Sequence, residues 1–378
     1  MHKASTVFFP NVAAMRERQW MDKSAYTYGL HGTPTTFTLE ERIATLEGGL
    51  QCLLAPSGLA ALALVNLGLL KTGDEVLLPD NAYGPGKDLA AGELRQFGIT
   101  HQVYDPMKPA DLADRVTPRT RLVWLEAAGS VTLEFPDLLA QARLCRELGV
   151  LSALDNTWGA GLAFNPFNLD GRGLAVDISV QALTKYPSGG GDVLMGSVVT
   201  RDAALHRKLK LCHMRLGLGV GGNDAEAVLR ALPTLPLRYA AADRSARRLA
   251  EWAARQAPFA QVLHPALPAS PGHAHWQAVC GAADAAGQGA AASLFSVVID
   301  EKFSREQVDA FCDALRLFRI GYSWGGPFSL VMPYELQAMR HDWPAHLARG
   351  TLVRFAIGLE DTADLQGDLQ HAMQQTLA

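Results

Sequence analysis

A chain of 378 residues, 48% of them hydrophobic and 19% charged, has the composition of a globular protein with a large core. The formal net charge of −4 excludes the basic excess that typifies binding to nucleic acid or to an anionic membrane. The longest apolar run, residues 58–70, is too short to span a bilayer, and the N-terminus is a poor signal peptide. We therefore expect a soluble cytoplasmic protein that binds neither nucleic acid nor a membrane.

The elements expected along the chain divide it into three parts. Residues 1–45 lack a regular alternation of strands and helices and predict an N-terminal arm, which leads into a helix over about 37–47. Apolar runs alternate with helical segments over residues 46–240, which predicts an α/β domain with a mainly parallel sheet covered by helices. Residues 241–378 predict a smaller α+β C-terminal domain. The strands expected in the larger domain lie in residues 50–56, 75–80, 101–105, 119–129, 150–157 and 177–185.

Chemically useful side chains follow several of these strands. Ligands of parallel sheets bind beyond the carboxyl ends of the strands, so the strand ends are where a site is expected. Lys185 ends one strand and Asp155 another, while Tyr83 follows a third. Ser57 and Gly58 stand before a helix, whose free amides and dipole favour a phosphate. Each of these features alone has an ordinary structural explanation, such as a helix cap or a surface lysine.

Together, these residue types meet the needs of pyridoxal phosphate. That cofactor requires a lysine to carry it, an acidic partner for its ring nitrogen, a phosphate cradle and a face for stacking. A nicotinamide cofactor is disfavoured, since the only near match to its glycine-rich turn, residues 217–222, does not follow a clear strand. The five cysteines are scattered and odd in number, so we expect buried thiols and no metal site.

The sequence resembles the Cys/Met-metabolism family of pyridoxal-phosphate enzymes, and within it the bacterial branch that cleaves cystathionine. The resemblance covers nearly the whole chain and implies fold type I, a homotetramer and active sites shared between neighbouring subunits. It rests on eight segments in the family's order: YGLHGTPTTFTLEERIATLEGG, APSGLAA, DNAYGP, DNTWGAG, DISVQALTKY, HPALPASPGH, YSWGG and GTLVRFAIGLED.

The resemblance also implies residue roles. Lys185 corresponds to the lysine that carries the cofactor and acts as the base, with Tyr83 stacked on the ring near the reacting centre and Asp155 at the ring nitrogen. The predicted phosphate ligands are the amides of Gly58 and Leu59, the hydroxyl of Thr184, and Tyr28 acting on a neighbouring subunit. Asn156 is a further candidate for cofactor contact. The predicted substrate-binding residues are Arg354, for the α-carboxylate, with Ser323 and Trp324 lining the pocket.

Two departures from the family stand out. The arm reads YGL where relatives carry Tyr-x-Arg, so Leu30 replaces a cation that would join Tyr28 on the phosphate. We hypothesise that another cation compensates, since the rest of the cradle is intact, and His31 is the neighbouring candidate. Residues 189–191 are three glycines where many relatives carry a bulkier run, and they predict a tight turn after Lys185.

The expected reaction is β-elimination of L-cystathionine to homocysteine, pyruvate and ammonia, within methionine biosynthesis. Trp324 before paired glycines, and the lack of a cysteine just after Tyr83, favour this branch. Three alternatives remain open: a broader lyase for cysteine and its S-conjugates, γ-elimination or γ-replacement, and a non-catalytic regulatory protein that kept the fold.

Overall fold

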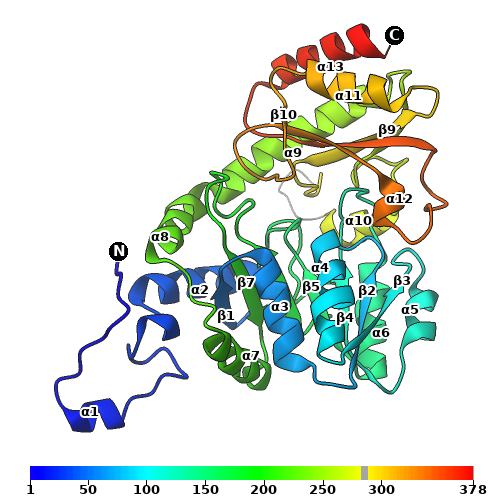
Figure 1. Ribbon diagram of the computed structural model, residues 1–378. Coiled ribbons are helices and arrows are strands. Elements are labelled where there is room, and N and C mark those ends of the chain that lie inside the picture. Colours follow the sequence, from blue (N-terminus) through cyan, green and yellow to red (C-terminus); the bar gives the residue numbers. More distant parts are fainter. Residues whose placement is uncertain (282–287, 378) are drawn as a thin grey trace.

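The computed structural model describes residues 1–281 and 288–377, which form an N-terminal arm, a large α/β domain and a smaller domain (Figure 1). The arm extends away from the body, while the C-terminus lies on the far side of the smaller domain. None of the described helices combines the length and the apolar character that crossing a bilayer requires.

The large domain contains a seven-stranded sheet in the order β1-β7-β6-β5-β4-β2-β3. Strands β3, β2, β4, β5 and β6 run parallel, so their carboxyl ends meet at one edge, whereas β7 is antiparallel to both of its neighbours. The sequence did not reveal β7, but the other six expected strands are present. Their bounds are β1 Gln51–Ala55, β2 Glu75–Pro79, β3 Thr100–Tyr104, β4 Thr120–Glu126, β5 Leu151–Asp155, β6 Ile178–Ala182 and β7 Gly196–Thr200.

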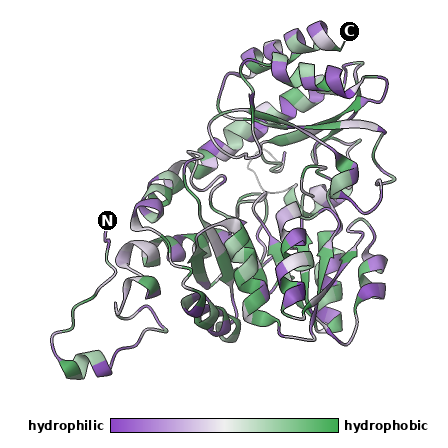
Figure 2. Ribbon diagram, viewed as in Figure 1, coloured by the Kyte–Doolittle hydropathy of each residue, from purple (hydrophilic) through white to green (hydrophobic). Residues whose placement is uncertain are grey.

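Helices cover this sheet, and Figure 2 shows that the strands and α3 are predominantly apolar. Helix α3 packs on β6 and β7, and its apolar residues form a buried cluster with the strands. This burial explains why the continuous apolar run of residues 58–70 forms a core helix. The helical elements up to the domain boundary are α1 Val12–Arg16, η1 Gly29–His31, α2 Pro34–Glu47, α3 Gly58–Leu69, α4 Gly84–Leu89, η2 Ala90–Leu94, α5 Pro109–Arg115, α6 Leu138–Leu148, α7 Ala203–Leu216, α8 Gly222–Ala231, η3 Leu232–Thr234 and α9 Leu235–Ala253.

The smaller domain packs helices against a five-stranded, largely antiparallel sheet in the order β10-β11-β12-β9-β8. Helix α9 extends from the large domain into it, and the boundary expected near residue 240 falls inside this helix. The remaining elements are β8 Phe259–Leu263, α10 His273–Cys280, β9 Leu294–Asp300, α11 Arg305–Ala314, β10 Arg319–Ile320, β11 Leu330–Tyr334, α12 Leu336–Met339, β12 Gly350–Ala356 and α13 Thr362–Thr376.

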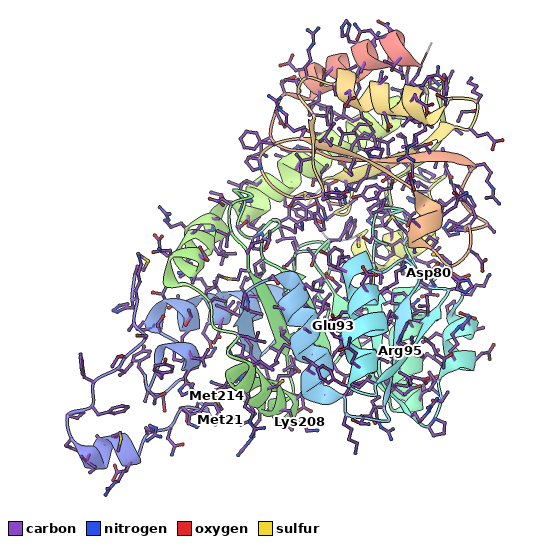
Figure 3. The ribbon with its side chains drawn as sticks, in the orientation of Figure 1. Met21, Asp80, Glu93, Arg95, Lys208 and Met214 are labelled. Carbon is purple, nitrogen blue, oxygen red and sulfur yellow. The ribbon has the colours of Figure 1, made fainter. Side chains whose placement is uncertain are left out.

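The two domains are also joined near the carboxyl ends of the parallel strands. Lys87 on α4 donates to the backbone oxygens of Asp80 (2.8 Å) and Met339 (2.6 Å), and Figure 3 shows Asp80 close to the segment around α12. Arg340, which follows α12, forms a buried ion pair with Glu134 of the large domain at 3.1 Å. These contacts hold the smaller domain over the strand ends, where the candidate site lies.

Candidate active site

Lys185 lies between the two domains, just beyond the end of β6. Its Nζ donates to Ser323 Oγ at 3.0 Å and lies 5.3 Å from the ring centre of Trp324. Burial lowers the pKa of Lys185 to about 8, and the nearby charge of Arg354 acts in the same direction, while Asp155 opposes both. A neutral amine is therefore accessible near physiological pH, as a nucleophile or a base needs.

A glycine allows the loop with Ser323 and Trp324 to approach Lys185 so closely. Gly325 has a φ of +76°, and a Cβ there would lie 3.0 Å from the backbone nitrogen of Tyr186. The loop therefore rests on the backbone next to the lysine. The turn expected after Lys185 is also present, with Gly189 at a φ of +69°, and a Cβ at Gly189 would clash with the guanidinium of Arg238.

Asp155 ends the neighbouring parallel strand, so the fold brings its carboxyl to the same edge as Lys185. One of its oxygens, Oδ1, accepts from the backbone nitrogen of Thr157 at 3.0 Å and from its hydroxyl at 2.6 Å. Burial raises the pKa of Asp155, whereas the two bonds from Thr157 and the charge of Lys185 stabilise the carboxylate. A protonated ring nitrogen beside Asp155 would stabilise it further.

The N-terminus of α3 lies beside the end of β6, where it could hold a phosphate. Ser57 caps this helix by accepting from the backbone nitrogen of Ala60, and the first-turn amides of Gly58 and Leu59 have no partner within the helix. A Cβ at Gly58 would lie 2.7 Å from that of Ala182, so glycine permits this approach. The hydroxyl of Thr184 exchanges hydrogen bonds with the backbone of Met195 at 3.1 and 3.2 Å, which anchors it to the start of β7.

Arg354 reaches the site from β12 of the smaller domain. Its side chain is buried, and its Nη2 donates to the backbone oxygens of Tyr322 at 2.7 Å and Ser323 at 3.3 Å. Within the described residues its Nε is buried without a hydrogen-bond partner, which suits a donor for a ligand carboxylate. Tyr334, which the sequence did not single out, stacks under this guanidinium with 5.3 Å between Cζ and the ring centre.

Tyr83 follows β2 and lies at the same edge, with 44% of its surface exposed. Burial of its hydroxyl raises the pKa of Tyr83, and Asp155 and Glu126, once ionised, raise it further. Its exposed ring is available to stack on a cofactor. The backbone nitrogen of Tyr83 donates to Glu126 Oε2 at 2.8 Å, and the sequence did not single out Glu126.

Asn156 is next to Asp155 but makes a different contact. Its side chain is fully buried, and its Nδ2 donates to Glu47 Oε1 at 2.9 Å. Ser179 Oγ donates to the same oxygen at 2.7 Å, and burial raises the pKa of Glu47. The amide nitrogen thus ties the end of β5 to α2, while Oδ1 of Asn156 is buried without a hydrogen-bond partner among the described residues. Contact of Asn156 with the cofactor stays a prediction.

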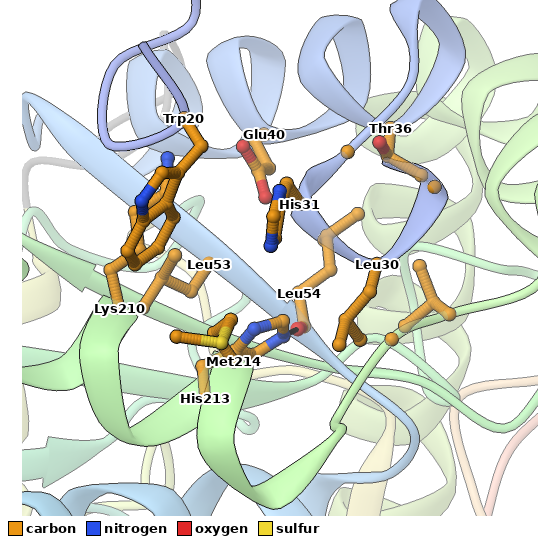
Figure 4. A pocket seen from close by; sticks show the side chains of 14 residues that line it. Trp20, Leu30, His31, Thr36, Glu40, Leu53, Leu54, Lys210, His213 and Met214 are labelled. Atoms are coloured by element: carbon orange, nitrogen blue, oxygen red, sulfur yellow. Dashed lines mark hydrogen bonds between the residues drawn. The ribbon is translucent and has the colours of Figure 1, made fainter. Parts of the chain in front are cut away.

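Tyr28 lies on the arm directly before η1, and 47% of its surface is exposed. Leu30 and His31 line a cavity between the arm and α7, together with Trp20, Glu40 and Lys210 (Figure 4). The Nδ1 of His31 is hydrogen-bonded to the hydroxyl of Thr27 at 2.8 Å. Compensation for the missing arm cation stays a prediction.

These residues fit pyridoxal phosphate. The site combines a buried amine of lowered pKa at Lys185, a carboxyl at Asp155, and free amides at a helix start that only glycine lets approach. The fold and the site therefore define a pyridoxal-phosphate-dependent enzyme of fold type I, as the sequence predicted.

Comparisons with known proteins agree. The family described as "Cys/Met metabolism PLP-dependent enzyme" matches residues 1–374. The chain is 38% identical to the cystathionine beta-lyase of Bordetella avium, covering 99% of this chain and 91% of that one. It is 35% identical to the cystathionine beta-lyase MetC of Escherichia coli (strain K12), and the match covers 98% of this chain and 91% of that protein. A crystal structure of cystathionine gamma synthase from Xanthomonas oryzae pv. oryzae superposes with a TM-score of 0.86 at 29% identity, covering 100% and 92%.

The chain belongs to the Cys/Met-metabolism family of pyridoxal-phosphate-dependent enzymes. The family, the fold and the cofactor expected from the sequence are thus confirmed.

Proposed function

We propose that the chain is a carbon–sulfur lyase that cleaves L-cystathionine by β-elimination to homocysteine, pyruvate and ammonia. The observation that carries this proposal is the amine of Lys185, which lies beside Asp155 and Arg354 with its pKa lowered to about 8. The similarity to proteins named cystathionine beta-lyase supports the choice of substrate.

Each residue of the site has a distinct task in this reaction. Pyridoxal phosphate, when bound, supplies a ring that takes up the electron pair left at the substrate Cα. The amides of Gly58 and Leu59, with Thr184, hold the phosphate, and Asp155 holds the proton on the ring nitrogen. Arg354 binds the α-carboxylate through the guanidinium edge that includes its unpartnered Nε.

Lys185 moves the protons. Its neutral Nζ takes the proton from the substrate Cα, the electron pair left there forms the double bond between Cα and the β-carbon, and the sulfur leaves with the electrons of the broken bond. Lys185 returns the proton to the leaving sulfur, which gives homocysteine, and water hydrolyses the remaining 2-aminoacrylate to pyruvate and ammonia. The hydrogen bond to Ser323 and the ring of Trp324 fix the direction of this amine. The main alternative is γ-elimination, since a cystathionine gamma synthase shares this fold closely. That reaction would require a second proton abstraction further along the substrate side chain.

The arm supports a further proposal about assembly. Three of its aromatic side chains, Phe8, Tyr26 and Tyr28, are exposed, with Phe8 at 92% and Tyr28 at 47%, and a surface of this kind suits contact with a second copy of the chain. We propose a homotetramer in the cytoplasm, in which Tyr28 reaches the cofactor phosphate of a neighbouring subunit. Sedimentation would report the oligomeric state.

One assay tests the proposed reaction. The purified holoenzyme is given L-cystathionine, and the keto acid that forms is identified. Pyruvate is expected, whereas 2-oxobutyrate would assign the chain to the γ branch. Lys185→Ala should abolish turnover, while Lys302→Ala, at an exposed lysine far along the chain, serves as the matched control. Full activity of Lys185→Ala would refute the mechanism.

A further inference from the structure

Glu126 is a carboxyl at the site that the proposed mechanism does not use. It is the last residue of β4, and the strand register pairs it directly with Asp155 of β5. Paired residues on neighbouring parallel strands point to the same face of the sheet, and the strands are only about 4.8 Å apart. Glu126, Asp155 and Tyr83 also line one small cavity together.

Glu126 also holds the loop that presents Tyr83. Its Oε2 accepts from the backbone nitrogen of Tyr83 at 2.8 Å. Tyr83 stands immediately before α4 as its N-cap residue, and in the described part of the chain it makes no side-chain capping hydrogen bond to that helix. The bond from Glu126 therefore links the Tyr83 loop to the central sheet at a point where the local sequence provides no cap of its own.

Two neighbouring carboxyls of this kind do not both ionise readily, since each negative charge disfavours the other. Asp155 is better placed to keep its charge, because it accepts two hydrogen bonds from Thr157 and lies near the amine of Lys185. Burial raises the pKa of Glu126 well above its ordinary value, and the charge of Asp155 raises it further.

The other groups near Glu126 do not offset the rise in its pKa. The backbone amide of Tyr83, and then the charges of Arg340 and Lys87, lower the pKa of Glu126, but burial and the charge of Asp155 outweigh these three effects. Lys87 donates to the backbone oxygens of Asp80 and Met339, and Arg340 pairs with Glu134.

We propose that Glu126 is a positioning residue that carries a proton at neutral pH, holds Tyr83 in place through its backbone amide and leaves Asp155 as the single negative charge beside the cofactor ring. This inference rests on the proposed roles of Tyr83 and Asp155. It does not depend on which amino acid the enzyme cleaves.

Three variants test the two parts of the proposal. Glu126→Gln is neutral and keeps an acceptor for the Tyr83 amide, whereas Glu126→Met has a similar length and no acceptor. Glu75→Gln is the matched control. Glu75 is a buried carboxyl of the same sheet, and it lies at the start of β2, whereas the site lies beyond the end of that strand. Two quantities are measured for each: the dissociation constant of pyridoxal phosphate from the apoprotein, and the pH midpoint of the bound cofactor's absorbance in the holoenzyme.

Glu126→Gln should leave both quantities at their wild-type values, as should Glu75→Gln. Glu126→Met should raise the dissociation constant by about five- to tenfold, the effect of losing one hydrogen bond that orders the Tyr83 loop. If Glu126 were ionised, Glu126→Gln would remove a negative charge and lower the absorbance midpoint by about one pH unit. That shift would overturn the proposed protonation, and wild-type affinity in Glu126→Met would overturn the positioning role.

Thermal melting of each variant shows whether it is folded. If Glu126→Met does not fold, Glu126→Asp tests the same contact, because its carboxyl is withdrawn by one methylene and should also weaken cofactor binding. Neither readout requires turnover, so failure of the lyase assay and failure of this proposal are distinguishable.

Discussion

The guanidinium of Arg354 lies over the ring of Tyr334, with 5.3 Å between its Cζ and the ring centre. The two residues stand on neighbouring antiparallel strands, where Tyr334 pairs with Leu352, two residues before Arg354. Backbone oxygens of Tyr322 and Ser323 hold Nη2 of the same guanidinium. The arginine is therefore fixed from two directions, while its Nε is left for a ligand.

Replacing Tyr334 by Ala should weaken substrate binding more than it slows turnover. Loss of a partly buried stacking contact of about 1–2 kcal/mol predicts a rise in KM of roughly five- to thirtyfold. Steady-state kinetics with L-cystathionine measures both constants. Tyr334→Phe keeps the ring and removes only the hydroxyl, which also interacts with Arg354. We expect a smaller rise in KM than in Tyr334→Ala, and an equal loss in both variants would show that stacking is not the cause.

The rate at which the apoprotein binds pyridoxal phosphate should rise with pH and level off above about 8, because the pKa of Lys185 is lowered to about 8. Only the neutral amine attacks the cofactor carbonyl, so the rate should fall about tenfold for each pH unit below that midpoint. Stopped-flow absorbance between pH 6 and pH 10 measures the profile.

The same profile tests the influence of Arg354, whose charge helps to lower the pKa of Lys185. Arg354→Met should move the midpoint upward, toward the ordinary value of a lysine. Arg305→Met, at an exposed arginine whose side chain is 73% accessible, is the control and should leave the midpoint in place. An unchanged midpoint in Arg354→Met would contradict this electrostatic coupling.

Gly325→Ala should disturb the loop that holds Ser323 and Trp324 against Lys185. The added Cβ would lie 3.0 Å from the backbone nitrogen of Tyr186, at a φ of +76° that alanine adopts poorly. We expect kcat/KM to fall at least about tenfold, since the loop also positions Arg354. Gly171→Ala has a φ of +70° and open space around it, so it should retain activity; equal losses would indicate a general folding defect.

Asn156→Ala should destabilise the apoprotein as well as the holoenzyme. It removes a donor to the buried carboxyl of Glu47, which predicts a loss of about 1–3 kcal/mol in the free energy of unfolding. Denaturant titration measures this loss. Asn223→Ala, at an exposed position of α8, should change stability by less than about 0.5 kcal/mol. A defect seen only in the holoenzyme would instead support direct cofactor contact by Asn156.

The sequence alone was sufficient for the class of fold and for the residues at the strand ends. Alternating apolar and amphipathic segments indicate a covered parallel sheet, and the carboxyl ends of its strands meet at one edge for topological reasons. Lys185 and Asp155 could therefore be placed together before any coordinates were known. The sequence did not reveal β7, because periodicity does not distinguish a strand of five residues from another short buried segment.

Only the tertiary structure decided the contacts that depend on register and on domain packing. Glu126 faces Asp155 because β4 and β5 pair at those positions, and sequence spacing does not specify that register. Asn156 meets Glu47, 109 residues away in the chain, because α2 packs behind the sheet. Arg354 and Ser323 reach Lys185 because the smaller domain folds over the strand ends, and this placement follows from long-range burial that local patterns do not encode.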